Sequence, residues 1–172
     1  MKITPILIFS LFLATACAAQ QNPRGEAIHA MCPVMHPADS ELNARGEKGM
    51  GFSQSATTHH FLLTSDGGMI QVEVNDPSNA DDLANIRMHL HHIANAFQAG
   101  DFDIPMFVHD TVPPGEPELK QLKAKIRYEI HETAAGGRVQ ISSSDKNAII
   151  AIHKFLIFQI QEHQTGDPIQ IP

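Results

Sequence analysis

The stretch RMHLHHI, residues 87 to 93, brings three histidines and a methionine into seven positions. On a helix, which turns by about 100° per residue, His89 and His92 lie on one flank and His91 lies on the other. Neutral imidazole is the commonest metal ligand, and two histidines one turn apart present two nitrogens together. The spacing predicts that His89 and His92 bind one ion and that His91 does not. The alternative is a pair of partly buried, hydrogen-bonded histidines, because this spacing is common on helices.

An ion held by two histidines needs further ligands from elsewhere in the chain. His59 and His60 are neighbours on an expected strand, where successive side chains point to opposite faces, and we expect His59 to face the helices. His109 is another candidate, with Met106 close by in sequence and Asp110 available to orient an imidazole. The predicted ion is copper or zinc, and the predicted ligands are His59, His60, His89, His92, His109 and Met106.

The stretch MCPVMHP, residues 31 to 37, is a possible second site. It combines the thiolate of Cys32, the thioether of Met35 and the imidazole of His36, a set that suits a soft ion such as Cu(I). The stretch resembles the Cys-Pro-Met-His-Pro segment of short heavy-metal-binding domains in bacterial copper-efflux proteins, with Val34 as an insertion that changes the ligand spacing. The resemblance implies a copper site, and the alternative is a disordered tether with one incidental cysteine.

The elements that would position these residues begin with a hairpin. Residues 57 to 74 alternate between apolar and polar around SDGG, which predicts two antiparallel strands. Pairing Thr64 with Met69 would place His59 opposite Val74, on the sheet face that also carries Phe61. Residues 81 to 99 predict a helix that ends at Gly100, with one apolar stripe formed by Leu83, Ile86, Leu90, Ile93 and Phe97.

The same order of elements recurs in the second half of the chain. KIRYEIHET and RVQISSS flank AAGG, and a second helical pattern covers residues 145 to 164. Gly67-Gly68 aligns with Gly136-Gly137, and AGD (99–101) aligns with TGD (165–167). The sequence therefore predicts an α+β fold: a duplicated ββα unit, with repeats at 57–100 and 124–166, forming a four-stranded antiparallel sheet with two helices on one face. The proline-rich linker between the repeats is expected to be extended.

The first residues indicate export. Lys2 is the only charge ahead of an apolar run and small residues, which is typical of a secretory signal over residues 1 to 19. LATAC resembles the lipobox of bacterial lipoproteins and would make Cys17 a lipidated first residue, so the protein is either periplasmic or anchored to the membrane there. Residues 20 to 37 predict a flexible tether, followed by one domain over 38–172. Ser40 is expected to cap a short helix that runs to about Lys48.

Composition narrows the class of ligand. Without Lys2, 11 basic and 19 acidic side chains remain, a net charge near −8 that argues against a nucleic-acid partner. The eleven histidines all lie beyond the signal. His131, His153 and His163 have no partner that spacing predicts, and we interpret them as surface or core-edge residues.

From MGFSQSATTHHF to FQIQEHQTGD the sequence resembles an uncharacterised family of exported bacterial proteins. Some relatives carry an aspartate carbamoyltransferase label. This chain is too short for that enzyme, lacks its Ser-Thr-Arg-Thr phosphate loop, and has hairpins where a βαβ order would be needed. The resemblance therefore implies export but no activity.

Three functions are compatible with the sequence. The first is an exported metal-binding protein, for copper or zinc, in buffering, delivery or resistance. The second is a haem-binding protein or metal-dependent enzyme that uses the same histidines, although the chain lacks GxSxG, HExxH, a phosphate loop, a dinucleotide fingerprint and CxxCH. The third is a histidine-rich binding module without metal.

Overall fold

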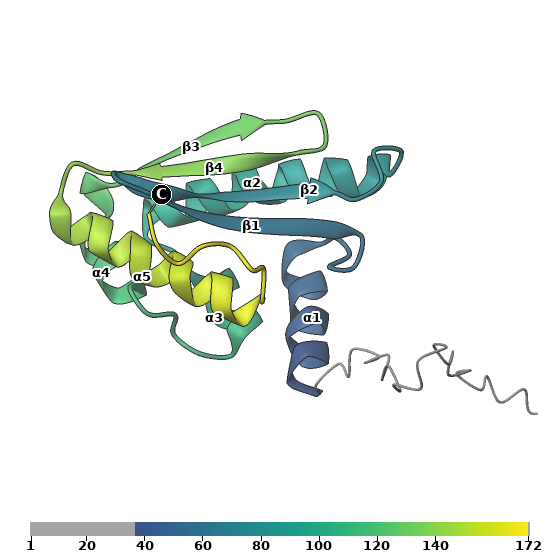
Figure 1. The fold of residues 1–172 in the computed structure, drawn as a ribbon, viewed down its shortest axis with the longest axis horizontal. Helices are drawn as coiled ribbons and strands as arrows, with labels where there is room; N and C mark the ends of the chain where they lie inside the picture. Colours follow the sequence, from purple (N-terminus) through teal and green to yellow (C-terminus); the bar gives the residue numbers. More distant parts are fainter. Residues whose placement is uncertain (1–36, 172) are drawn as a thin grey trace, which may run out of the picture. The chain divides into compact units, whose positions relative to one another are not determined.

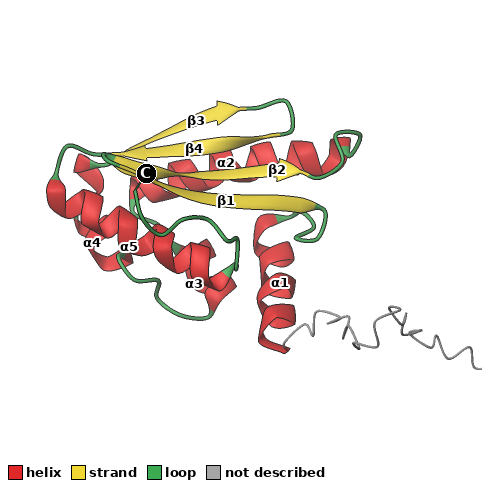
Figure 2. Ribbon diagram, in the orientation of Figure 1, coloured by secondary structure: helices red, strands yellow, loops and turns green. Residues whose placement is uncertain are grey.

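A four-stranded antiparallel sheet with helices on one face confirms the predicted α+β class (Figures 1 and 2). The computed structural model describes residues 37–171. The sheet has the strand order β1-β2-β4-β3, so each hairpin supplies one edge strand and one central strand. The elements are α1 (Pro37–Met50), β1 (Thr57–Thr64), β2 (Gly67–Val74), α2 (Ala80–Ala99), α3 (Asp103–His109), α4 (Glu116–Gln121), the 3-10 turn η1 (Lys123–Lys125), β3 (Arg127–Glu132), β4 (Gly136–Ser142) and α5 (Lys146–Glu162).

The first hairpin is tighter than the sequence suggested. Thr64 pairs with Gly67 and His59 with Val72, so the predicted register is wrong by two residues. The glycines begin β2 instead of forming the turn, and the turn shrinks to two residues. A slip of two leaves every side chain on its predicted face, because strand side chains alternate with period two. His59 and Phe61 therefore still face the helices.

The two long helices cover the same face of the sheet, α5 against β1 and β2, and α2 against β3 and β4 (Figure 1). Asn79 caps α2 by accepting a hydrogen bond from the amide of Asp82, and Gly100 ends the helix in the left-handed conformation, as the sequence predicted. Asp145 caps α5 in the same way. Their buried stripes meet the apolar sheet face, and Ile86, Leu90, Val139, Ile152 and Leu156 are almost fully enclosed.

Glycines at equivalent positions bring the two central strands close together. A Cβ on Gly67 would collide with the carbonyl oxygen of Ile141, and a Cβ on Gly136 would collide with that of Val72. These contacts are related by the duplication, because β2 and β4 run antiparallel side by side. Gly67 also has a φ of 152°, which other residues rarely adopt.

The structure corrects two further expectations. The linker between the repeats is not extended, because it contains α3, α4 and η1. Ser40 does not cap α1, which already begins at Pro37. The predicted signal, the lipidation residue Cys17 and the second site of Cys32, Met35 and His36 lie outside the described residues, as does the tether apart from Pro37. Between residues 37 and 171, no helix is both long and apolar enough to cross a membrane.

Candidate functional site

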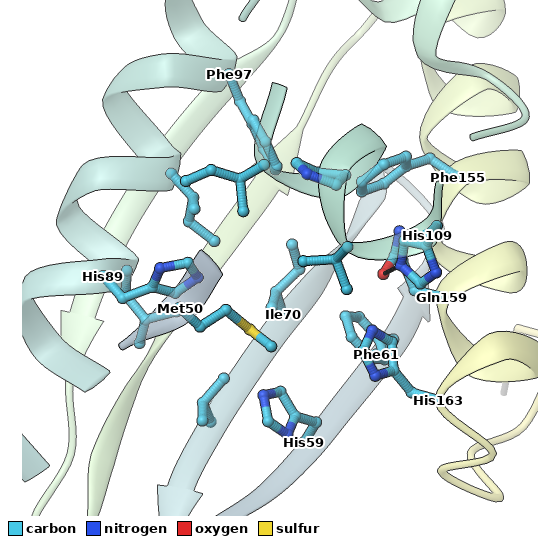
Figure 3. Close-up of a pocket in the computed structure, with 16 residues that line it drawn as sticks. Met50, His59, Phe61, Ile70, His89, Phe97, His109, Phe155, Gln159 and His163 are labelled. Carbon is cyan, nitrogen blue, oxygen red and sulfur yellow. Dashed lines mark hydrogen bonds between the residues drawn. The ribbon is translucent and has the colours of Figure 1, made fainter. Parts of the chain in front are cut away.

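A pocket beneath the sheet is lined by six side chains that can coordinate or hydrogen-bond and by ten apolar ones (Figure 3). The cavity between them is small, about 50 Å³, and it opens to solvent on one side. An apolar pocket into which a few polar groups converge is the usual form of a ligand site. The six are Met50, His59, His89, His109, Gln159 and His163.

Separate elements deliver the four histidines. His59 comes from the helix-facing side of β1, and His89 from the buried stripe of α2. His109 is the last residue of α3, and His163 directly follows α5 as its C-cap residue. Met50 ends α1, and in Figure 3 its side chain reaches between His89 and His59 with the sulfur toward the middle of the pocket. Residues far apart in sequence thus surround one space.

The rings form a chain of contacts. The centre of the His163 ring lies 5.8 Å from that of His59 and 5.0 Å from that of His109. Phe52 contacts both His59 and His89, with ring centres 5.8 and 5.6 Å away. Two imidazoles on one ion have ring centres about 5 Å apart, since each nitrogen lies about 2 Å from the metal. The spacing at His163 is close to that value.

Three buried nitrogens at the pocket have no hydrogen-bond partner among the described residues: His59 Nε2, His109 Nδ1 and Gln159 Nε2. His109 Nε2 lies 3.0 Å from Gln159 Oε1, so the ring donates through Nε2 and keeps a free lone pair on Nδ1. The carboxylate of Glu162 is 3.9 Å from that Nδ1. An unpaired buried polar atom costs about 1–3 kcal/mol. Three unpaired nitrogens at one pocket indicate that a ligand or a water molecule pairs with them.

Burial keeps the imidazoles neutral. It lowers the pKa of His59 and of His89 to about 4, with the charge of neighbouring histidines adding to each shift. Desolvation also lowers the pKa of His163 to about 3, and that of His109 falls for the same reason. His59 and His163 keep one side partly open to solvent, whereas His89 and His109 are each 8% exposed. At neutral pH each ring therefore offers a lone pair.

The rings are not arranged as a finished coordination sphere. Across the described part of the chain, no three His, Cys, Asp or Glu side chains are placed to hold an ion without moving. His59 and His163 are stacked with only 11° between their planes, whereas ligands point nitrogens at a common centre. Binding of an ion would require these side chains to rotate.

The structure brings together only part of the predicted ligand set. His59, His89 and His109 line the pocket as expected. His92 does not, because its position lies past the edge of the buried stripe of α2 and it is exposed. Met106 does not line it either.

His60 points to the other sheet face, where its Nδ1 lies 2.9 Å from Asp167 Oδ1. His91 is outside the pocket, as predicted, with its Nε2 3.8 Å from a carboxylate oxygen of Glu132. His131 is exposed, and His153 bonds the carbonyl oxygen of Thr64 through Nε2 at 2.9 Å. None of these four histidines contributes to the pocket.

Three pocket residues were not predicted from the sequence as site residues: Met50, Gln159 and His163. His163 follows the end of α5, where helical spacing no longer fixes a direction. The internal repeat could have located it, because His163 aligns with Phe97, a core residue of the predicted stripe. Nothing in the spacing distinguishes Met50 or Gln159 from packing residues.

Searches of family models, of curated proteins and of solved structures found no match to the chain. The resemblance to exported bacterial proteins therefore stays a prediction, and the candidate site is argued from its own geometry.

Proposed function

We propose that the pocket binds a transition-metal ion, copper in the first place and zinc as the alternative, through His59, His89, His163 and Met50. His109 completes the set or orients His163. One observation carries the proposal: neutral, buried imidazoles open onto one pocket, and the nitrogens His59 Nε2 and His109 Nδ1 lack a partner. In an exported protein such a site serves buffering, delivery or resistance. Export itself rests on the predicted signal.

The donor chemistry favours copper. Imidazole suits copper and zinc, and a thioether adds a preference for Cu(I). Calcium and magnesium require oxygen ligands, and among residues 37–171 no carboxylate lines the pocket. Metal binding would satisfy nitrogens that otherwise lose hydration without compensation.

Haem is a weaker second candidate: the ten apolar residues of the lining would suit it, but a cavity of about 50 Å³ would have to widen greatly to admit a porphyrin. Histidine and methionine both serve as axial ligands, and an apolar surround suits a porphyrin. Haem would give a Soret absorption band, whereas copper or zinc alone would not.

The test is the metal content of the full chain purified without an affinity tag. We expect about one copper or zinc ion per chain, and at least tenfold weaker binding in each of His59→Ala, His89→Ala and His163→Ala. His131→Ala is the matched control, because His131 is exposed on the sheet's other face. Far-UV circular dichroism verifies folding of each variant. Equal metal retention in all four variants, or none in the parent protein, contradicts the proposal.

A further inference from the structure

A second cavity adjoins the pocket from outside, and we call it the vestibule. It is lined by the amides of Asn43 and Gln54, by three threonines, and by His59 and His163. Those two histidines also line the pocket, so they form a wall that the two spaces share. The vestibule encloses about 540 Å³, much of it open to solvent. An ion bound by His59 and His163 would therefore have one side turned toward solvent.

The site lacks a negative charge for such an ion. Imidazole and thioether ligands are neutral, so Cu²⁺ or Zn²⁺ would keep its full charge in a mostly apolar pocket, which is unfavourable without a counter-charge. In the part of the chain that the structure describes, no Asp or Glu lines the pocket or the vestibule. Glu162 approaches only His109, from a half-exposed position. Asp167 already accepts bonds from His60, Thr165 and the amide of Phe61.

Among the described residues, the vestibule offers one buried donor without a partner. Thr57 donates to the carbonyl of Ser53, and the other two threonine hydroxyls are also bonded. Gln54 Nε2 is buried and has no partner among the described residues. Gln54 lines the same vestibule as His59 and His163, and an amide N–H can donate to an anion bound there.

We infer that a small monovalent anion enters through the vestibule, occupies a coordination position of the metal ion in exchange for water, and accepts a hydrogen bond from Gln54 Nε2. The inference rests on the proposed metal site and names its co-ligand. The exchange is a substitution at the metal, and no electron is transferred.

Azide is a suitable probe, because it is a small anion whose binding to Cu²⁺ produces a charge-transfer absorption band. The full chain is loaded with Cu²⁺ in chloride-free buffer and titrated with sodium azide, with copper content measured in parallel. We expect a saturable band that the metal-free protein does not give. Gln54→Leu should weaken azide binding at least fivefold and Gln54→Glu should abolish it, both with copper content unchanged. Gln71→Leu, on the other sheet face, is the control and should bind azide as the parent does.

The outcomes separate the two proposals. Copper-loaded protein that gives no azide band overturns the anion site and leaves the metal site intact. Equal azide binding in the parent and both Gln54 variants overturns the role of Gln54. A chain that binds no copper overturns both proposals.

Discussion

The two halves of the duplicated fold place different chemistry at equivalent positions. On β1, His59 pairs with Val72. On β3, Tyr128 pairs with Ile141, and the aligned glycine pairs make these two positions equivalent. One half therefore carries an imidazole where the other carries a phenol.

The helix ends repeat the same contrast. Phe97 precedes Gly100 in the first half as His163 precedes Gly166 in the second. The ring centres of Phe97 and Tyr128 are 5.9 Å apart, and those of His163 and His59 are 5.8 Å apart. The fold thus builds the same ring pair twice, once from aromatic residues and once from histidines.

The pair Phe97–Tyr128, at what we call the aromatic end of the core, is closely packed. The pair His59–His163, at the histidine end, borders the open pocket. Phe102 and Phe155 pack against Phe97, with ring centres 4.4 and 5.8 Å away. The space beside Tyr128 has no room for a water molecule, whereas a cavity of about 50 Å³ lies beside the histidines. Burying a phenyl ring stabilises the folded state, whereas burying an imidazole without a hydrogen-bond partner destabilises it, because the ring loses its hydration.

The comparison indicates that the fold does not require histidines at these positions. Aromatic rings satisfy the framework at these two positions, so packing alone does not explain His59 and His163. Natural proteins depart from locally favourable choices mainly at functional sites. The departure of one repeat from its copy is therefore the best pointer to function in this chain.

The largest effect that distinguishes the two ends should be a dependence of stability on pH. The unfolded chain protonates His59 and His89 near pH 6.5, whereas the folded chain does so near pH 4. The unfolded state therefore binds more protons between these values, and the free energy of unfolding falls as pH drops from about 6.5 to 4. We expect a loss of about 3 kcal/mol from each residue, measured by urea unfolding of metal-free protein.

Replacing a pocket histidine by the aromatic residue of the equivalent position tests whether the buried imidazoles cause this dependence on pH. His59→Tyr places the residue of the equivalent Tyr128 position on β1 and should reduce the loss between pH 6.5 and 4.5. His131→Ala, at an exposed position, should leave the loss unchanged. A parent protein whose stability is constant from pH 7.5 to 5 would show that the imidazoles are not desolvated.

The next effect should appear in both halves, because the close approach of the two central strands belongs to the shared framework. Gly67→Ala and Gly136→Ala each push a methyl group into a backbone carbonyl across the β2–β4 pair. We expect each to destabilise the protein by about 2 kcal/mol in urea unfolding. Gly51→Ala is the control for backbone strain alone, since its φ is 81° and no atom lies within 4 Å of the added carbon. Gly67→Ala should cost more than Gly136→Ala, because Gly67 also has a φ of 152°. A Gly136→Ala variant as stable as the parent protein would argue against a symmetric framework.

Much of the fold could be predicted from sequence, because period two, period 3.6 and the repeated Gly-Gly pairs are strong local signals. The register of the first hairpin could not, since SDGG permits either a four-residue or a two-residue connection. The error did not affect the site, because face parity placed His59 toward the helices in both registers.

The pocket was harder to predict, because its members converge through tertiary packing. Helical angles placed His89 beside the core but gave no measure of where the stripe ends, and His92 proved to be exposed. His109 was chosen for proximity, and α3 does bury it at the pocket. His163 could be predicted only by aligning the two repeats, because it lies beyond the end of α5 and helical spacing gives no direction for its side chain.

The smallest expected effect concerns the aromatic end. The hydroxyl of Tyr128 is buried without a partner among the described residues, and burial raises the pKa of this group. Tyr128→Phe removes the unpaired oxygen and keeps the ring against Phe97, so the free energy of unfolding should rise by about 1 kcal/mol. For a domain of this size the melting temperature should increase by a few degrees, about 2–4 °C. A decrease of similar size would show that a buried water pairs with the hydroxyl. Both ends of the core would then be polar, and the histidine end would lose its claim to be the exceptional one.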